Sequence, residues 1–131
     1  MSVSDIEFLA LAKTKIADAK SEPEFRCIVN RAYYGAYHHS INIHNLLPSH
    51  GTMPPYPAGT HEKLIYQLEH PTFSKQSSEQ KYNLSISIGY ILRGLKRIRS
   101  NADYDLSSSI GKNEASNAIA QSESIFSKKL V

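Results

Sequence analysis

The sequence predicts an all-α protein, an antiparallel bundle of four to five helices that forms one domain over residues 1–131. Apolar residues recur at helical spacing along nearly the whole chain, and no run of alternating apolar and polar residues indicates a strand. Short and medium connections join the long amphipathic segments, which favours antiparallel neighbours. A length of 131 residues is also usual for one domain with a single core.

We expect the first helix over residues 4–20. Ser4 and Glu7 have the spacing of a capping box, in which each side chain binds the backbone N–H of the other residue. The residues expected to face the core are three or four apart: Ile6, Leu9, Ala12, Lys13, Ile16 and Ala17.

A second capping box, formed by Ser21 and Glu24 with Pro23 in the first turn, predicts a helix that continues to about Leu47. One face carries an apolar stripe: Phe25, Val29, Ala32, Ala36, Ile43 and Leu47. A second side is also aromatic and apolar: Tyr33, Tyr34, Tyr37 and Ile41. A helix that is apolar on more than one side is central in its bundle or is also covered by a partner. The tyrosines are therefore either the edge of the core or the wall of a site or interface.

A polar line lies between these two sides of the helix. Asn30, Tyr34 and His38 follow one another at four-residue spacing, and Arg31 lies one turn before Tyr34. Arg31 alone would be a surface charge or the partner of an acid. The whole line beside an aromatic face is typical of a lined groove, so both interpretations stay open.

The rest of the chain predicts a loop and three more helices. Residues 48–60 hold four prolines and two glycines, which indicates a loop that ends with Thr60 as a cap. Helices are expected over residues 61–69, 77–100 and 112–129. In the last of them the inward residues would be Ala115, Ala118, Ile119, Ser122, Ile125 and Phe126.

Arg99 stands out at the end of the fourth predicted helix. The buried stripe of that helix is Leu84, Ile88, Ile91, Leu95 and Ile98, and Arg99 lies at its margin. A half-buried arginine needs an acid, a carbonyl or a bound anion, and Asp103 and Asp105 are close in sequence. Arg99 is therefore either paired structurally with Asp103 or available to an anion. The cations around it, Arg93, Lys96 and Arg97, form either a solvated helix end or a surface for a polyanion.

Composition excludes several other classes of protein. The net charge of +3 does not by itself indicate nucleic acid. The chain has no apolar run of about 18 residues for a membrane span, no signal-peptide pattern and only one cysteine, Cys27. We therefore expect a cytoplasmic protein with no membrane contact. The histidines lack metal-site spacing and no phosphate-binding glycine loop occurs, so we expect no metal and no cofactor.

Three motifs resemble those of the small stand-alone HEPN-domain proteins of prokaryotes. They are "VNRAYYGAYHHSINI", "THEKLI" and "RSNADYDLSSSI". The family pattern is an N-R-A-Y-Y-A-x-F/Y-H helix, a T/S-H segment and R-x-x-A-D-Y after the fourth helix, and the three motifs keep this order across nearly the whole chain. The resemblance implies a HEPN-like helical bundle that forms a homodimer, with the arginine motif at the cleft between the subunits.

The resemblance also implies a function. HEPN proteins commonly bind RNA or act as metal-independent endoribonucleases, often as toxins in toxin–antitoxin or phage-defence systems beside a nucleotidyltransferase-like antitoxin. The catalytic residues it implies are Arg99, which would hold a phosphate, Asp103, which would orient Arg99 or Arg31, and Tyr104, which would contact a base. We also expect the residues in and beside this cleft to bind RNA or phosphate: Arg31, Tyr34, His38, Arg97 and Asn101.

The chain departs from the nuclease motif, in which a histidine follows the arginine after four to six residues. Tyr104 is the fifth residue after Arg99, and no histidine occurs after His70. Cleaving RNA through its 2′-hydroxyl needs an acid and a base, and histidine serves because its pKa lies near neutrality. His38 would substitute if it reached the cleft. The alternative is a non-catalytic adaptor that dimerises through the tyrosine face of the second helix and binds a partner such as a nucleotidyltransferase.

Overall fold

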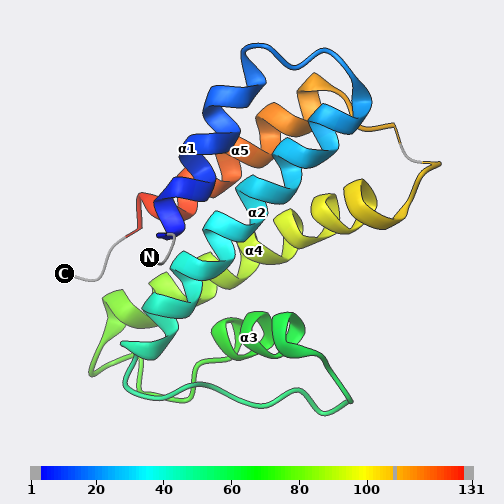
Figure 1. The fold of residues 1–131 in the computed structure, drawn as a ribbon. Helices are drawn as coiled ribbons and strands as arrows, with labels where there is room; N and C mark the ends of the chain where they lie inside the picture. Colours follow the sequence, from blue (N-terminus) through cyan, green and yellow to red (C-terminus); the bar gives the residue numbers. More distant parts are fainter. Residues whose placement is uncertain (1–3, 108, 129–131) are drawn as a thin grey trace.

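The computed structural model describes residues 4–107 and 109–128, and all regular structure in these two ranges is helical (Figure 1). The helices are α1 (Asp5–Ile16), α2 (Glu22–Asn45), α3 (Thr60–Glu69), α4 (Glu79–Tyr104) and α5 (Lys112–Phe126). They pack against one another as a bundle, so the predicted all-α fold class is confirmed. None of the described helices is long and apolar enough to span a bilayer.

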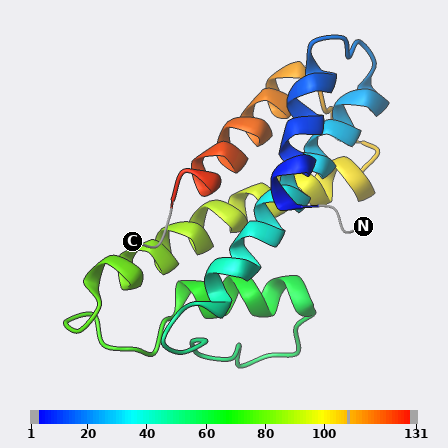
Figure 2. The same ribbon diagram turned by 60° about the vertical axis from the view of Figure 1, so that its left-hand side comes forward.

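The second helix, α2, is the centre of the bundle and contacts each of the other four helices. The short turn after α1 makes α1 and α2 antiparallel, and α4 and α5 are joined in the same way (Figure 1). The short helix α3 packs chiefly on α4, away from α1 and α5, and the long loop before it runs beside it (Figure 2). This arrangement brings the middle of α2, the start of α3 and the second half of α4 to one region.

Local sequence signals explain how the first two helices begin. The backbone N–H of Ser4 donates to Glu7 Oε2 at 3.2 Å, and that of Ser21 donates to Glu24 Oε1 at 3.1 Å. Both predicted capping boxes are therefore confirmed.

Other helix boundaries differ from the sequence prediction by a few residues. α1 ends at Ile16 rather than at Lys20, and α2 ends at Asn45 rather than at Leu47. The carbonyl groups in the last turn of a helix have no intrahelical hydrogen-bond partners. The spacing of apolar residues alone therefore does not fix the residue at which a helix ends. The predicted end of the last helix, at Lys129, lies outside the described residues.

The end of α4 is the boundary that matters for the site. The helix continues to Tyr104, a turn beyond the predicted end at Ser100. Nη1 of Arg26, on α2, donates to the carbonyl oxygens of Asn101 and Ala102 at 3.1 and 2.9 Å. A guanidinium at these carbonyls supplies partners that the last turn would otherwise lack, and it complements the helix dipole. The "NADY" segment is therefore helical.

The core confirms the two-sided character of α2. Its predicted stripe is buried at Val29, Ala32, Ala36, Ile43 and Leu47, and Phe25 packs against the core from its edge. On the second side, the side chains of Tyr33 and Tyr37 are buried within the same chain. The prediction that this tyrosine face could serve as a dimer surface is therefore wrong for these two residues.

The inner stripe predicted for α1 is only partly correct. Leu9 and Ala12 are buried, whereas Ile6 is 50% exposed. The side chain of Lys13 is 53% exposed and forms an ion pair with Glu123. Because α1 is a peripheral helix, only a narrow stripe of it reaches the core.

Candidate functional site

Arg99 lies near the end of α4 with only 14% of its side chain exposed. Its Nε is 2.8 Å from Oδ2 of Asp103, one turn later on the same helix, which confirms the predicted pair. The N–H is not aligned with that oxygen, so the contact is an ion pair, and Nε makes no hydrogen bond to the described residues. The pair forms because α4 continues through Asp103, which places the two side chains on one helix face.

The polar line of α2 joins this pair from the other side. Nδ2 of Asn30 donates to the same Oδ2 of Asp103 at 3.0 Å. Nη1 of Arg31 donates to Oδ1 of Asn30 at 3.1 Å. A continuous chain of polar contacts therefore runs from Arg31 through Asn30 and Asp103 to Arg99.

Three tyrosine rings surround the guanidinium of Arg99. Its Cζ lies 5.5 Å from the ring centroid of Tyr33 and 5.4 Å from those of Tyr34 and Tyr104. Nη2 donates to Oη of Tyr34 at 3.2 Å and to Oη of Tyr104 at 3.4 Å. Rings at these distances stabilise a cation. Nη1 makes no hydrogen bond to any residue that the structure describes, so the group retains donor capacity.

His38 lies beside this cluster on α2 and is exposed. Its ring stacks on Phe8 with centroids 5.8 Å apart, and it lies 6.2 Å from Tyr34. It borders an open hollow of about 400 Å³ that Asp5 and Phe8 also line. Tyr34 is the ring that His38 and Arg99 share.

Arg97 and Asn101 are not brought to Arg99. Two residues along a helix correspond to a rotation of about 200°, so Arg97 and Arg99 point to opposite sides of α4. Arg97 and Asn101 instead line a separate hollow of about 270 Å³ with Arg93, Lys96 and Ser100. Of the residues expected at the cleft, the structure gathers Arg31, Tyr34, Asp103, Arg99 and Tyr104, and it places His38 next to them.

His61 of α3 is the residue at this site that sequence reasoning did not select. Its Nδ1 lies 2.5 Å from Oη of Tyr33, and its ring stacks on that of Tyr37 with centroids 4.0 Å apart. Its ring centroid is also 6.1 Å from that of Tyr34. His61 occurs in the "THEKLI" motif, but no spacing rule connects that motif to Arg99.

Burial and neighbouring charges set the protonation states of His61 and Tyr33. Burial, the positive charges of Arg99 and Lys96, and His38 lower the pKa of His61 below its ordinary value of 6.5. Burial also raises the pKa of Tyr33 well above 10, so its hydroxyl keeps its proton. At neutral pH the site therefore holds a cation, Arg99, near an uncharged imidazole.

Comparison of the chain with protein-family models, with curated proteins and with solved structures found no match. Among the described residues, no three His, Cys, Asp or Glu side chains gather where they could hold a metal ion. The chemistry that the site offers is that of an arginine, an imidazole and tyrosine hydroxyls.

Proposed function

We propose that this chain is a HEPN-like RNA-binding protein that acts as a metal-independent endoribonuclease, with a backbone phosphate bound at Arg99. The observation that carries the proposal is the setting of Arg99, whose guanidinium is held among Asp103 and three tyrosine rings while Nη1 makes no hydrogen bond to a described residue. Arginine suits a phosphate because its guanidinium is always charged and its N–H groups donate charge-assisted hydrogen bonds, and Nη1 carries the N–H groups that are left for such a ligand.

The aromatic neighbours support RNA as the anion. Unpaired bases bind proteins by stacking on aromatic side chains, and each stacked base contributes about 1–3 kcal/mol. Tyr104 is 74% exposed beside the guanidinium and Tyr34 is half-buried behind it, so a base next to the bound phosphate has a ring to stack on. Asp103 orients Arg99, and Asn30 holds Asp103 in turn.

A homodimer is part of this proposal, with the site near the contact between subunits and a toxin or phage-defence role beside a nucleotidyltransferase-like partner. The exposed surface of α4 supports an interface. Ile86, Tyr90 and Tyr104 recur at helical spacing on one face of this helix and are 38%, 78% and 74% exposed. Exposed apolar residues in such a row are typical of interaction surfaces.

The same row favours a second candidate function, a non-catalytic adaptor that binds a partner protein through α4. The two candidates differ in what they require of Arg99. Phosphate binding needs its guanidinium, whereas an adaptor surface centred on Ile86 and Tyr90, which lie on the side of α4 away from Arg99, does not.

The test compares Arg99→Ala with Arg97→Ala, a matched control that removes the same charge from the other side of α4. Binding of labelled single-stranded RNA is measured by fluorescence anisotropy and cleavage in EDTA by gel, with thermal melts to verify folding. We expect Arg99→Ala to lose both activities and Arg97→Ala to keep them. Equal behaviour of the two variants would contradict a phosphate site at Arg99. A folded wild-type protein that neither binds nor cleaves RNA would support the adaptor.

A further inference from the structure

We propose that His61 supplies the acid–base histidine that the arginine motif of this chain lacks, acting on the 2′-hydroxyl next to the phosphate that Arg99 holds. This inference rests on the proposed function. It assigns a catalytic role to a residue of α3, a different helix from the one that carries Arg99.

The position of His61 relative to Arg99 is the first argument. Both groups lie against the same two rings: the His61 ring centroid is 5.6 Å from that of Tyr33 and 6.1 Å from that of Tyr34. The Cζ of Arg99 is 5.5 and 5.4 Å from the same two centroids. In RNA the attacking 2′-hydroxyl and the phosphate belong to one nucleotide, so the proposal requires one bound nucleotide to contact both groups.

The second argument is that the imidazole is fixed in orientation. Tyr37 stacks on it with an interplanar angle of 8°, and the 2.5 Å contact between Nδ1 and Tyr33 Oη anchors one edge. When Nδ1–H donates to the Tyr33 hydroxyl, the lone pair of Nε2 is free to accept a proton. Nε2 makes no hydrogen bond within the described part of the chain. Catalytic histidines are commonly oriented through Nδ1 in this way.

The third argument is the charge state of the ring at neutral pH. Tyr33, Tyr34 and Tyr37 of α2 are neutral neighbours, and the cations that act on His61 from α4 are Arg99 and Lys96. Burial, these cations and His38 of α2 lower the pKa of His61, so the imidazole is in its basic form at pH 7.

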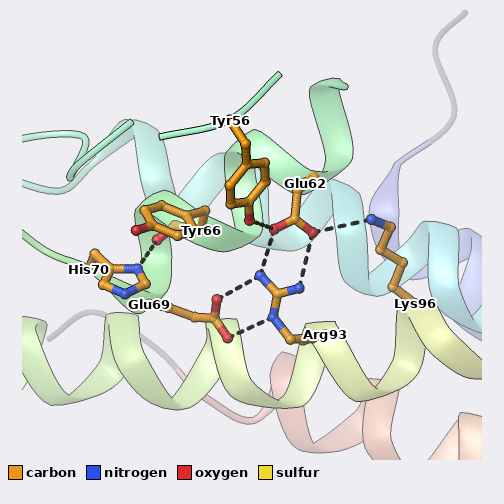
Figure 3. Close-up of polar contacts among 7 residues, drawn as sticks. All are labelled: Tyr56, Glu62, Tyr66, Glu69, His70, Arg93 and Lys96. Carbon is orange, nitrogen blue, oxygen red and sulfur yellow. Dashed lines mark hydrogen bonds and ion pairs between the residues drawn. The ribbon is translucent and has the colours of Figure 1, made fainter. Parts of the chain in front are cut away.

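An ion-pair clamp of Arg93 with Glu62 and Glu69 holds α3 on α4 (Figure 3). His61 is the second residue of α3. Arg93 of α4 donates to both oxygens of Glu62 at 3.0 and 2.8 Å, and to both oxygens of Glu69 at 2.9 and 2.7 Å. Oε2 of Glu62 also accepts a hydrogen bond from Tyr56 at 2.7 Å. Because Glu62 is the next residue after His61, the clamp holds the imidazole in place relative to α4.

The two helices also approach closely at Gly89 of α4. A Cβ atom there would lie 2.8 Å from Cγ of Glu69 and 3.0 Å from its backbone nitrogen. The glycine therefore permits α3 to lie directly on α4, which supports a fixed position for His61.

His38 is a weaker candidate for the same role. It is exposed, and its contacts with Phe8, Tyr34 and Tyr37 are all ring contacts. Neither of its ring nitrogens is anchored by a hydrogen bond to a described residue, in contrast to Nδ1 of His61.

The reaction needs no metal and no redox partner. Nε2 of His61 takes the proton of the 2′-hydroxyl as that oxygen forms a bond to phosphorus, while Arg99 stabilises the charge on the phosphoryl oxygens. The bond from phosphorus to the 5′-oxygen breaks, and this oxygen takes up a proton, which His61 returns directly or through water. The products are a 2′,3′-cyclic phosphate and a 5′-hydroxyl end.

The experiment compares wild type with His61→Asn, which keeps a polar atom near Tyr33 but removes the base, and with His70→Asn, a control at the exposed end of the same helix. Cleavage of single-stranded RNA is measured in EDTA, and binding is measured with 2′-O-methyl RNA, which cannot be cleaved. We expect His61→Asn to cleave roughly 100- to 10,000-fold more slowly. Its binding should stay within about twofold of wild type, and His70→Asn should behave as wild type.

The outcomes separate the two proposals. If His61→Asn cleaves as fast as wild type while Arg99→Ala does not, the role of His61 is overturned and the proposed function stands. RNA binding that depends on Arg99 without any cleavage overturns His61 as the base and leaves RNA binding intact. If Arg99→Ala binds and cleaves as wild type does, the proposed function fails, and this inference fails with it.

A second measurement uses the wild-type protein, in case His61→Asn does not fold. The ¹⁵N signals of the imidazoles are followed by NMR as 2′-O-methyl RNA is added. We expect the Nε2 signal of His61 to move while that of His70 stays in place. Unchanged His61 signals at saturating RNA would overturn the inference.

Discussion

Nδ2 of Asn30 and Oδ2 of Asp103, which are 73 residues apart in sequence, form a hydrogen bond of 3.0 Å. The bond joins the middle of α2 to the last turn of α4. The same carboxylate oxygen pairs with Arg99, so the position of the guanidinium depends on a residue of another helix.

Replacing Asn30 tests this connection. Asn30→Ala removes one part-buried hydrogen bond, which should lower the free energy of unfolding by about 1 kcal/mol. Because Asp103 and Arg99 then lose a constraint, the affinity for single-stranded RNA should fall as well. Urea unfolding and anisotropy measure the two effects, with Asn42→Ala, an exposed site on α2, as the control. An unchanged affinity would show that Asn30 has no part in orienting Arg99.

Replacing Arg99 by lysine separates its charge from its shape. Arg99→Lys keeps the cation but loses the planar guanidinium, which contacts Asp103 and two tyrosine hydroxyls while Nη1 remains for a phosphate. We expect a folded protein with weaker RNA binding than wild type, measured by anisotropy at fixed salt. The same substitution at Arg97 should have little effect. Full activity of Arg99→Lys would mean that the site needs only a positive charge.

The clamp in Figure 3 should control cleavage more than binding. Arg93→Ala leaves Glu62 and Glu69 without their shared partner. Because both ion pairs of Arg93 are partly exposed, the free energy of unfolding should fall by only about 1–2 kcal/mol. His61 then loses its fixed position while Arg99 keeps its own contacts, so cleavage should slow while binding of 2′-O-methyl RNA persists. Equal losses in both assays would show that the clamp serves the fold alone.

The free energy of unfolding should fall at acidic pH because Glu62 becomes protonated. Hydrogen bonding from Arg93 lowers the pKa of this carboxyl from 4.5 to about 2. Its contribution is therefore present above pH 4.5 and is lost as the pH falls from 4.5 toward 2. Urea unfolding is measured at pH 7 and pH 3. The decrease in the free energy of unfolding between these pH values should be smaller for Glu62→Gln than for wild type. Glu79→Gln, at an exposed position, should retain the wild-type loss.

The pH dependence of cleavage should report His61. A general base works when it is deprotonated, so the rate should rise with pH through a pKa below 6.5. Lys96 is one of the cations that lower this pKa, so Lys96→Gln should move the inflection to higher pH. Lys63→Gln, on the exposed side of α3, should not. An inflection that stays in place in Lys96→Gln would exclude His61 as the titrating group.

Features that depend on neighbouring residues were predictable from the sequence. The capping boxes at Ser4 and Ser21 and the stripes of α2 and α5 follow from spacings within one helix. The nearness of Arg99 and Asp103 in sequence also indicated their pair, although its helical geometry depends on the extra turn of α4.

Other features needed contacts from distant helices. The extra turn of α4 depends on Arg26, which comes from α2 and lies at its last carbonyls. That turn decides on which side Asp103 points, whereas the opposite facing of Arg97 and Arg99 is local, because both lie within the predicted helix.

The sequence by itself determined the helices, the central place of α2 and the arginine that needs a partner, because each is set by residues within a few turns of one another. Only the tertiary structure decided which histidine lies beside Arg99. The loop after α2 brings α3 back onto α4, and the clamp of Arg93 with Glu62 holds it there. This packing places His61 against Tyr33 and Tyr34, a contact that no local spacing encodes.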